Sequence, residues 1–590
     1  MATAAATLPK TKGGAFLIEE RSPSEIFTPE DFTEEHLAIA RTAAEFWNQD
    51  VAPHLEAVQH QEPGVAVGIL RKAARLGLTA VAVPEQYGGM EMDLVSAMIV
   101  AEHVARDGSV AACFGAHTGI GTLPILLFGT EEQKRRYLPK LATAEMVAAY
   151  ALTEPHAGSD ALAARTRADL SPDGLHYILN GQKMWITNGG SADLFTVFAK
   201  VNGEQFTAFL VERGFGVKSG AEERKMGIKG SSTTALYLDN VAVPVENVLG
   251  EIGRGHIIAF NILNLGRLKL GPFAVGGAKH VLAEGIRYAK ERKAFGSPIA
   301  EFGMIRHKLA EMAIRTFAAE SVVWRTAGLI ESYLEPLDWS LPDAAGVMLK
   351  AVEEFAPECS IVKVYASEAL DYVVDEGVQI FGGYGYHQDY AVERAYRDSR
   401  INRIFEGTNE INRLLTTGML LKRAARGQLP LVQAAHALLQ EILGGSSHGG
   451  ADEGEETRLL RNAKKTALLL MGVAYQRFLM ELEKQQEVLA GITDVIMDVF
   501  AMESALLRAR KLAAAGRGAH AEDMAAVFSR DAMARIDATA RTVLAACAEG
   551  DALRTHMAVL RRFTKYDPVD AIALRRRIAG RLLDAGRYFA

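Results

Sequence analysis

Glu406 stands at a point in the sequence where a glutamate could become a catalytic base. Residues 401–405 before it follow a helical pattern with one apolar face, Gly407 breaks that pattern, and Thr408 then offers the N-cap of a new helix. A carboxylate at such a break, beside a glycine that lets a ligand come close, can lose enough water to gain a raised pKa and act as a base. A solvated surface glutamate is the alternative, because perturbed carboxylates are a minority.

Four other segments carry polar, aromatic and glycine residues in patterns that suit cofactor binding. They are Tyr150–Asp160 (YALTEPHAGSD), Lys183–Gly189 (KMWITNG), Arg292–Gly296 (RKAFG) and Gln379–Gly385 (QIFGGYG), and they precede IFEGTNEI around Glu406. In this order and at this spacing the five segments resemble the acyl-CoA dehydrogenases over roughly residues 30–425. The likeness extends more loosely to the C-terminus, where it is to the very-long-chain type with an added C-terminal domain. Five linked motifs are specific, whereas any one alone would be weak.

The resemblance implies a binding site for FAD. The positions that match the family's cofactor contacts are Tyr150, Leu152, Thr153, Ser159, Trp185, Thr187, Arg292, Phe295, Gln379, Gly382, Gly383, Thr408 and Asn409. In the family, the threonine matching Thr187 reaches flavin N5 and the tryptophan matching Trp185 shields the ring. Arg292 and Gln379–Gly383 match positions that approach the FAD of a neighbouring subunit, and a guanidinium suits its pyrophosphate. Phe302-Gly303 departs from the glutamine that many relatives use at the adenosine end. Taken singly, the segments around Thr187 and Trp185 would be a turn loop and a core tryptophan.

The resemblance also implies contacts with a fatty acyl-CoA substrate. The matching positions are Ser159, Asn264, Arg267, Gly407, Ala112 and Gly115. On sequence alone, the small residues of 111–116 favour close helix packing, whereas the resemblance places Ala112 and Gly115 at the bottom of an acyl cavity. Some relatives carry their catalytic glutamate at the position of Gly266. Because a glycine offers no proton acceptor, the resemblance assigns the catalytic base to Glu406.

The implied reaction is the FAD-dependent α,β-dehydrogenation of a medium- or long-chain fatty acyl-CoA to trans-2-enoyl-CoA, the first step of fatty-acid β-oxidation. Glu406 would take the α-proton while a hydride leaves Cβ for the flavin, and the electrons would pass to an electron-transfer flavoprotein. Two alternatives stay open. One is an acyl-CoA oxidase that uses dioxygen, and the other is a non-enzymatic member of the family with a scaffold role in complex assembly.

The composition narrows the function classes. A chain of 590 residues exceeds the size of one hydrophobic core, so several domains are expected. The net charge of -7 argues against a nucleic-acid-binding protein. Three scattered cysteines, Cys113, Cys359 and Cys547, support neither a disulfide framework nor a metal site. We see no secretory signal or Arg-rich transit peptide at the N-terminus and expect a bacterial cytoplasmic protein.

The patterns predict an α+β fold with an added helical domain. The expected parts are an N-terminal extension (1–29), a helical domain (30–149), a middle antiparallel β domain (150–252), a catalytic helical domain (253–428), a linker (429–456) and a C-terminal helical domain (457–590). In the helical domain we expect one helix from Thr28 to about Ala57 and another that starts at Glu131 and stops near Pro139. The stretch Gly444–Glu456, rich in glycine, serine and acidic residues, predicts flexibility.

The C-terminal domain raises two further expectations. The helix expected at Leu459–Phe478 combines basic residues with an apolar run, so it could lie on an anionic membrane surface, although a buried helix is the commoner case. The resemblance also implies a homodimer, because the added domain would cover the surface on which shorter relatives build a second dimer contact.

Overall fold

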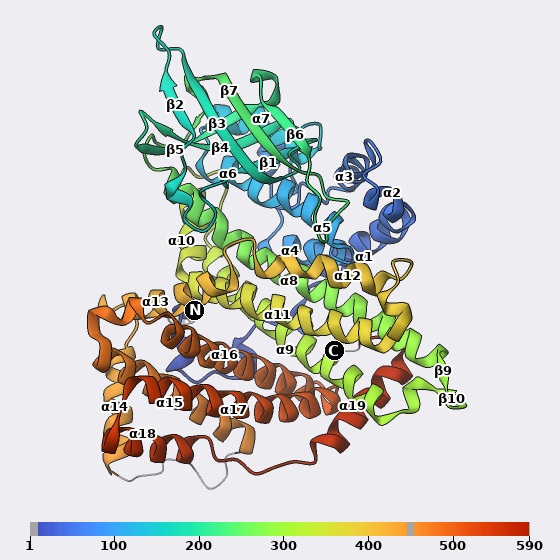
Figure 1. Cartoon of the computed structure of the whole chain (residues 1–590), viewed down its shortest axis with the longest axis vertical. Coiled ribbons are helices and arrows are strands. Elements are labelled where there is room, and N and C mark those ends of the chain that lie inside the picture. Colours follow the sequence, from blue (N-terminus) through green and yellow to red (C-terminus); the bar gives the residue numbers. More distant parts are fainter. Residues whose placement is uncertain (1–9, 445–453, 589–590) are drawn as a thin grey trace, which may run out of the picture.

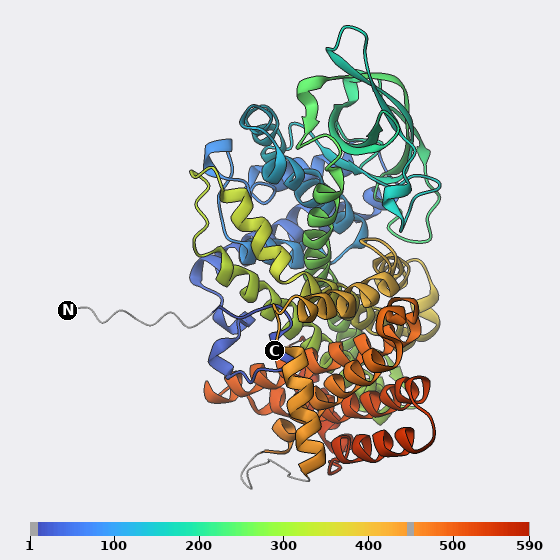
Figure 2. The same ribbon diagram turned by 90° about the vertical axis from the view of Figure 1, so that its left-hand side faces the viewer.

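The computed structural model describes residues 10–444 and 454–588. The β domain and the first helices lie at one end of the molecule, and the C-terminal helices lie at the other (Figure 1). The long helices α8 (Gly255–Glu291), α9 (Gly303–Leu334) and α11 (Ala356–Phe381) run between these two ends. A view from the side shows the same division (Figure 2).

The N-terminal helices are α1 (Glu34–Phe46), α2 (Leu55–Gln59), α3 (Val65–Arg75), α4 (Leu94–Val104), α5 (Gly108–Gly115), α6 (Leu123–Phe128) and α7 (Glu131–Ala142). A capping box between Thr130 and Gln133 starts α7, as its spacing predicts. The expected stop near Pro139 is wrong, because the helix runs through this proline to Ala142. Pro139 lies in the last turn, where its carbonyl still accepts a hydrogen bond from the Thr143 N–H at 3.2 Å.

The single helix expected from Thr28 is also broken. Pro29–Asp31 forms a 3-10 turn, Thr33 caps a fresh start to α1, and a π-helical turn at Trp47–Val51 interrupts the helix before α2. The side chain of Thr33 accepts a hydrogen bond from the His36 N–H at 3.2 Å. Thr28 and Thr33 are thus two possible N-caps for a helix in this region, and the apolar periodicity does not show which of them starts the long helix.

Eight strands form the sheet of the middle domain: β1 (Ala148–Ala151), β2 (Arg167–Leu170), β3 (His176–Thr187), β4 (Leu194–Val201), β5 (Gln205–Glu212), β6 (Lys218–Glu222), β7 (Thr233–Pro244) and β8 (Val248–Leu249). Their order is β6-β7-β3-β2-β4-β5-β8, with β1 beside β4. Most pairs are antiparallel as expected, but β1–β4 and β2–β4 are parallel, so the sheet is mixed. Apolar alternation shows which face of a strand is buried and not the direction of its neighbour.

The catalytic helices follow the sheet. Besides the three long helices they comprise α10 (Ala344–Glu354), α12 (Ala391–Ser399) and α13 (Asn409–Ala425), with a small hairpin of β9 (Lys293–Ala294) and β10 (Ser297–Pro298) after α8. Gly271 in α8 allows close packing of these helices. A Cβ at Gly271 would lie 2.4 Å from Val362 Cγ1 of α11, so a larger residue would force the two helices apart.

The C-terminal helices are α14 (Leu431–Gly444), α15 (Glu455–Phe478), α16 (Gln486–Ala514), α17 (Ala519–Cys547), α18 (Gly550–Phe563) and α19 (Ala571–Ala585). Helix α14 occupies half of the interval 429–456 that we expected to be a linker, because its apolar residues pack against α15. The stretch Gly444–Glu456, for which we predicted flexibility, lies mostly outside the described residues.

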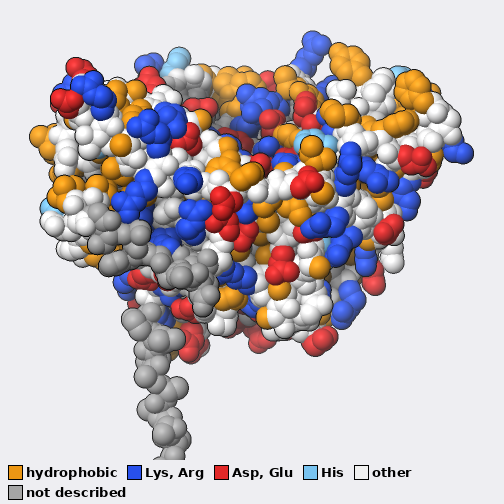
Figure 3. All heavy atoms as spheres, turned by 90° about the horizontal axis from the view of Figure 1, so that it is seen from below, with side chains coloured by type: hydrophobic (Ala, Val, Ile, Leu, Met, Phe, Trp, Pro, Cys, Tyr) orange, Lys and Arg blue, Asp and Glu red, His pale blue; other side chains and the backbone are white. Residues whose placement is uncertain are grey.

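The apolar run of α15 is buried, with Leu459, Ala463, Leu470 and Ala474 fully covered by the neighbouring helices. The face seen from below mixes charges of both signs with scattered hydrophobic side chains (Figure 3). The run that could have met a membrane is therefore part of a protein core. The segment Gly108–Phe128 is apolar and long enough to span a membrane, but it too is mostly buried within the described part of the chain.

The extension before α1 is docked between the catalytic and C-terminal helices. Phe16 packs on Phe500 of α16 with ring centroids 4.6 Å apart, and the Gly14 N–H donates to the Glu358 carboxylate of α11 at 2.7 Å. Arg508 of α16 is buried between the carboxylates of Glu30 and Glu320. These contacts fix the C-terminal helices to the rest of the chain.

Candidate active site

Glu406 lies in a left-handed turn between the 3-10 helix η13 (Arg400–Arg403) and α13. Its φ is 59° and that of Gly407 is 77°, so two successive residues adopt a conformation that is unfavourable for a glutamate. The side chain of Thr408 caps α13 by accepting a hydrogen bond from the Ile411 N–H. The break that the sequence predicts is thus a strained turn that points one carboxylate away from both helices.

Three side chains from two other segments and from α13 hold this turn. Arg267 Nε of α8 donates to the Glu406 carbonyl at 3.2 Å, and Lys363 Nζ of α11 donates to the Gly407 carbonyl at 2.8 Å. The Asn412 amide also donates to the Gly407 carbonyl, at 2.9 Å. Sequence analysis identified Arg267 but missed Lys363 and Asn412. These donors offset the strain of the turn, which keeps the carboxylate in one position.

Glu406 is half-buried as a residue, but its Oε2 is buried and has no hydrogen-bond partner within the described residues. Burial raises the pKa of Glu406 to about 7, although the nearby charges of Arg267 and Lys363 lower it. A Cβ at Gly266 would lie 2.5 Å from Glu406 Oε2, so the glycine is what makes room for the carboxylate. The result is a single unpartnered carboxylate that can exchange a proton near neutral pH.

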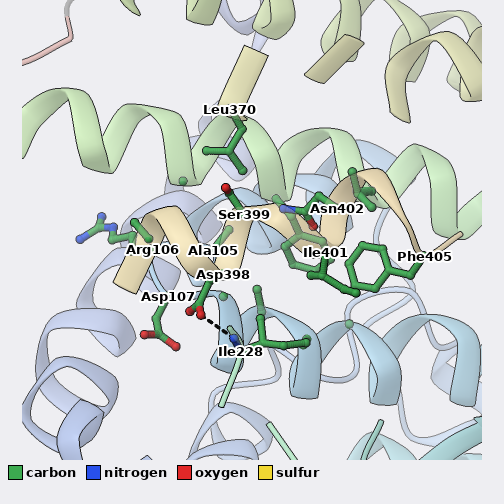
Figure 4. A pocket seen from close by; sticks show the side chains of 18 of the residues that line it. Ala105, Arg106, Asp107, Ile228, Leu370, Asp398, Ser399, Ile401, Asn402 and Phe405 are labelled. Carbon is green, nitrogen blue, oxygen red and sulfur yellow. Dashed lines mark hydrogen bonds between the residues drawn. The ribbon is translucent and has the colours of Figure 1, made fainter. Parts of the chain in front are cut away.

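A cavity with about 1150 Å³ of empty space, part of it open to solvent, begins at this carboxylate. It passes between α5 and α8, and its wall includes Ala112, Gly115, Thr187 and Gly266. Figure 4 shows Leu370, Ile401 and Phe405 among its lining residues, with the Asp398 carboxylate accepting from the Ile228 N–H. Ala112 and Gly115 therefore line the cavity, and larger side chains there would fill part of it; their expected place at its bottom stays a prediction.

Several residues expected at the flavin gather beside the same cavity. Thr187 ends β3 at the cavity wall, and two residues earlier Trp185 is half exposed with a positive φ of 60°. The buried hydroxyl of Tyr150 has no partner in the described residues, and burial raises the pKa of this tyrosine, with a further contribution from the charge of Glu406. Ser159 is exposed on the loop after β1, and Leu152 is buried.

An unpredicted ion pair fixes this loop to the sheet. Lys183 Nζ of β3 donates to Glu154 at 2.6 Å and to the Leu152 carbonyl at 3.2 Å, and both charged side chains are almost fully buried. The Met184 N–H donates to the Thr153 carbonyl at 2.9 Å. Both charged residues stand inside motifs that the sequence analysis quoted, so their types were visible although their pairing was not.

A second set of expected cofactor residues lies away from this cavity. Arg292, Phe295, Gln379, Gly382 and Gly383 are exposed around the β9–β10 hairpin and the end of α11. Phe295 is 97% exposed, and the Arg292 guanidinium lies 5.5 Å from the centre of the Tyr384 ring. Within one chain these residues lie away from Glu406. This position is compatible with the expected role at the cofactor of a neighbouring subunit.

Two other expected contacts are used inside the protein. Asn409 is buried, and its side chain bonds to Lys363, Ser367 and Glu368, so it faces α11 and has no free amide for a cofactor. Asn264 accepts a hydrogen bond from Arg267 Nη1 at 2.8 Å. We therefore correct the expectation for the Asn409 side chain, whose hydrogen-bonding capacity is consumed by the support of the turn.

The residues present fit an FAD group. The partnerless hydroxyl of Tyr150, the hydroxyl of Thr187 at the cavity wall and the half-exposed ring of Trp185 provide polar and aromatic contacts at one place. A buried hydroxyl without a partner is costly, and a ligand that supplies one relieves that cost.

Comparisons with known proteins agree with this arrangement. The acyl-CoA dehydrogenase N-terminal domain matches residues 33–145, the middle domain matches 149–241, and the C-terminal domain matches 253–420. A further family described as acyl-CoA dehydrogenase, C-terminal domain, matches residues 462–562. Together these matches cover most of the chain.

Individual relatives give the same assignment. A probable acyl-CoA dehydrogenase of Bacillus subtilis is 47% identical over 583 residues and covers 98% of each chain. The human mitochondrial very long-chain specific acyl-CoA dehydrogenase is 43% identical over 350 residues, 58% of this chain and 51% of that protein. A crystal structure of acyl-CoA dehydrogenase complexed with FAD from Bacillus anthracis is 48% identical, with a TM-score of 0.97 over 98% of this chain and 100% of that one.

Butyryl-CoA dehydrogenase from Megasphaera elsdenii matches a smaller part, 66% of this chain and 99% of its own, at 36% identity and a TM-score of 0.60. The added helices account for the difference in length. On the sequence matches and the shared fold, this chain belongs to the acyl-CoA dehydrogenase family of FAD-dependent oxidoreductases.

Proposed function

We propose that this enzyme converts medium- and long-chain fatty acyl-CoA to trans-2-enoyl-CoA, as the first step of fatty-acid β-oxidation, and passes the electrons to an electron-transfer flavoprotein. The observation that carries the proposal is the unpartnered carboxylate of Glu406 at one end of a cavity with mostly apolar walls. Such a cavity suits an alkyl chain, and such a carboxylate suits the removal of a proton from the carbon next to a thioester.

The length of the cavity supports a medium or long chain. Its wall follows α8 from Gly266 to Val281, a separation of 15 residues, or about 22 Å at 1.5 Å per residue. An extended chain advances about 1.2 Å per bond, so roughly 18 bonds fit along this wall. The range of acyl chain lengths in the proposal therefore rests on the length of the cavity and not on Glu406.

Glu406 performs the proton step. Its carboxylate takes the pro-R α-proton, and the electron pair of that Cα–H bond forms the new Cα=Cβ double bond. The electron pair of the Cβ–H bond leaves with hydrogen as a hydride and reduces the acceptor. FAD, when bound, supplies that hydride acceptor, and the side chains of Tyr150, Thr153, Trp185 and Thr187 would hold it. A pKa of about 7 leaves a large fraction of Glu406 ionised at neutral pH and still basic enough to accept the proton.

The backbone at Glu406 can assist. In the described part of the chain the Glu406 N–H donates no hydrogen bond, and the bond from Arg267 Nε to the carbonyl of the same residue holds this backbone in place. A free N–H at this place would stabilise the negative charge that develops on the thioester oxygen. Closure of the cavity by the acyl chain would expel water and raise the pKa of Glu406 further.

The proposal is tested on the purified holoenzyme under anaerobic conditions. Addition of octanoyl-CoA or palmitoyl-CoA is expected to bleach the flavin absorbance at a rate much faster than steady-state turnover without an acceptor. No bleaching by any acyl-CoA would contradict the proposal and favour the scaffold alternative. Rapid reoxidation of the reduced enzyme by dioxygen, in place of reoxidation by an electron-transfer flavoprotein, would favour an oxidase.

A further inference from the structure

Lys269 is a buried lysine without a counter-charge. Among the described residues, three other lysines are equally buried, and each has two close acceptors: Lys183 bonds to Glu154 and Leu152, Lys363 to Gly407 and Asn409, and Lys464 to Glu503 and Glu19. Lys269 has one, the Thr118 carbonyl, at 3.4 Å. An ammonium has three donors, so at least two of those on Lys269 are unused within the described chain.

The side chain of Lys269 lines the acyl cavity close to the reacting end. It lies on α8 one turn after Gly266, which contacts the Glu406 carboxylate, and residues three apart on a helix share a face. Its stem passes over Gly119, where a Cβ would lie 3.7 Å from Lys269 Cδ. Farther along the same helix come Leu270 and Phe273, so an acyl chain that starts at Glu406 must pass Lys269.

Lys269 also lines a second cavity on the other side of the same wall. Its lining includes the carboxylate residues Glu91, Asp93 and Glu331 as well as the apolar side chains of Leu94, Leu123, Leu126, Leu127, Leu265 and Trp339. Within the described residues none of these carboxylates forms an ion pair or hydrogen bond with the Lys269 ammonium, and burial lowers the pKa of Lys269 to about 8. Besides the Thr118 carbonyl, no acceptor in the described residues bonds to this ammonium, so water or a ligand in the acyl cavity can take its remaining hydrogen bonds.

A buried charge without a partner costs several kcal/mol, so a plain alkyl chain that expels water from Lys269 binds against that cost. An oxygen atom on the chain removes the cost by accepting the unused hydrogen bonds. Resting on the proposed function, we propose that Lys269 recognises an oxygen acceptor on the acyl chain, so that substrates with a carboxylate or hydroxyl group beyond the reacting carbons are preferred over unsubstituted chains of the same length.

The position of the acceptor follows from the helix. Three residues of α8 separate Gly266 from Lys269, or about 4.5 Å along the axis. At about 1.2 Å per bond this places the Lys269 backbone roughly four bonds beyond the α-carbon, level with the sixth carbon of the acyl chain, while the ammonium reaches from there toward the Thr118 carbonyl. Six-carbon acyl-CoA compounds are therefore the sharpest probes.

The experiment compares hexanoyl-CoA, 6-hydroxyhexanoyl-CoA and adipoyl-CoA on FAD-loaded protein. Glu406→Gln blocks turnover, and isothermal titration calorimetry then gives each dissociation constant with and without Lys269→Met. With Lys269 present, we expect the two oxygen-bearing compounds to bind about tenfold or more tightly than hexanoyl-CoA, since a hydrogen bond to a charged group contributes about 1.5–3 kcal/mol. Lys269→Met should abolish this difference and leave hexanoyl-CoA binding equal or tighter.

Controls separate the explanations. Lys290→Met removes a lysine from the same helix outside both cavities and should change no ratio. If Lys269→Met is unstable by thermal melting, Lys269→Gln provides a neutral donor that should keep the preference for the hydroxyl and lose that for the carboxylate. Equal ratios in the presence and absence of Lys269 would overturn the inference. Tighter binding of adipoyl-CoA alone would restrict it to carboxylates.

Flavin bleaching distinguishes a failure of the proposed dehydrogenation from a failure of the role of Lys269. If none of the three compounds, and no longer acyl-CoA, bleaches the flavin of the enzyme with Glu406 intact, the proposed dehydrogenation is wrong. If hexanoyl-CoA bleaches it and the binding ratios do not depend on Lys269, the dehydrogenation stands and the role of Lys269 is wrong.

Discussion

Gly266 and Glu406 form a matched pair across the active site, because a methyl group on Gly266 would sit 2.5 Å from Glu406 Oε2. The carboxylate occupies space that only a glycine leaves free. The pair links helix α8, which carries Arg267 and Lys269, to the strained turn before α13. A change on the helix is thus felt directly by the base.

Gly266→Ala should therefore slow flavin reduction without unfolding the protein. The added methyl displaces the carboxylate, and a displacement of about 1 Å costs on the order of 10²-fold in rate. Anaerobic stopped-flow with octanoyl-CoA measures the effect. Gly418→Ala is the matched control, because a Cβ at this helical glycine would meet nothing within 4 Å. Equal rates in both variants would show that Glu406 tolerates the methyl.

Glu406→Gln should give a folded, yellow protein that binds acyl-CoA and does not dehydrogenate it. The amide keeps the shape of the side chain and removes the proton acceptor, so the loss should reach or exceed the 10²–10⁴-fold typical of general-base catalysis. Single-turnover flavin reduction is the measurement. Reduction at a rate near that of the unchanged enzyme would mean that another group takes the proton.

The rate of dehydrogenation should rise with pH through about 7. Glu406 has a pKa raised to about 7 by burial, and only its ionised form accepts a proton, so kcat/KM falls as the pH drops below that value. Burial lowers the pKa of Lys363 to about 7 as well, and its charge lowers that of Glu406, so the profile reports the joint titration of the pair. A flat profile between pH 6 and 8 would exclude Glu406 as the titrating base.

Some parts of this site could be predicted from the sequence and others could not. The helical pattern up to Phe405 and the glycine after Glu406 predicted the break, because both signals are local. The partners of the turn were not predicted, since Lys363 donates to Gly407 from a different helix and the contact arises only from the packing of α11 against α13. The pairing of Lys183 with Glu154 was missed for the same reason.

The domain pattern shows the same limit. The sequence predicted an antiparallel β domain over 150–252, but the parallel contact of β1 with β4 depends on which strands become neighbours. The residues Arg292 and Phe295 were named from their motif, and one chain leaves both exposed. The role at a neighbouring subunit's cofactor that the resemblance implies for this segment stays a prediction, because the periodicity of one chain gives no information about a second copy.

Gly115→Phe should shift the preference toward shorter acyl chains. A Cβ at Gly115 would lie 2.9 Å from the Phe273 ring, so a second ring fills the cavity between α5 and α8. Each methylene excluded from an apolar site costs about 0.8 kcal/mol of binding. The ratio of kcat/KM for palmitoyl-CoA to that for octanoyl-CoA should fall, and the octanoyl-CoA rate is the internal reference. An unaltered ratio would show that the chain takes another path.

The C-terminal helices should limit the assembly to a homodimer. They cover α9 and α13 through contacts that include the buried pair Arg325–Glu503 at 2.7 Å and the bond of Arg413 to Asp494, also at 2.7 Å. A chain cut after Leu429 loses these contacts and exposes an apolar surface larger than the few hundred Å² that soluble proteins tolerate.

We expect the full-length protein to be a dimer by light scattering, since the exposed Arg292 and Phe295 need one partner to complete a cofactor site. The truncated protein should form tetramers or aggregates, because the uncovered face of α9 and α13 then seeks a second contact. A tetramer of the full chain, or a truncated chain that stays a clean dimer, would contradict this role of the added domain.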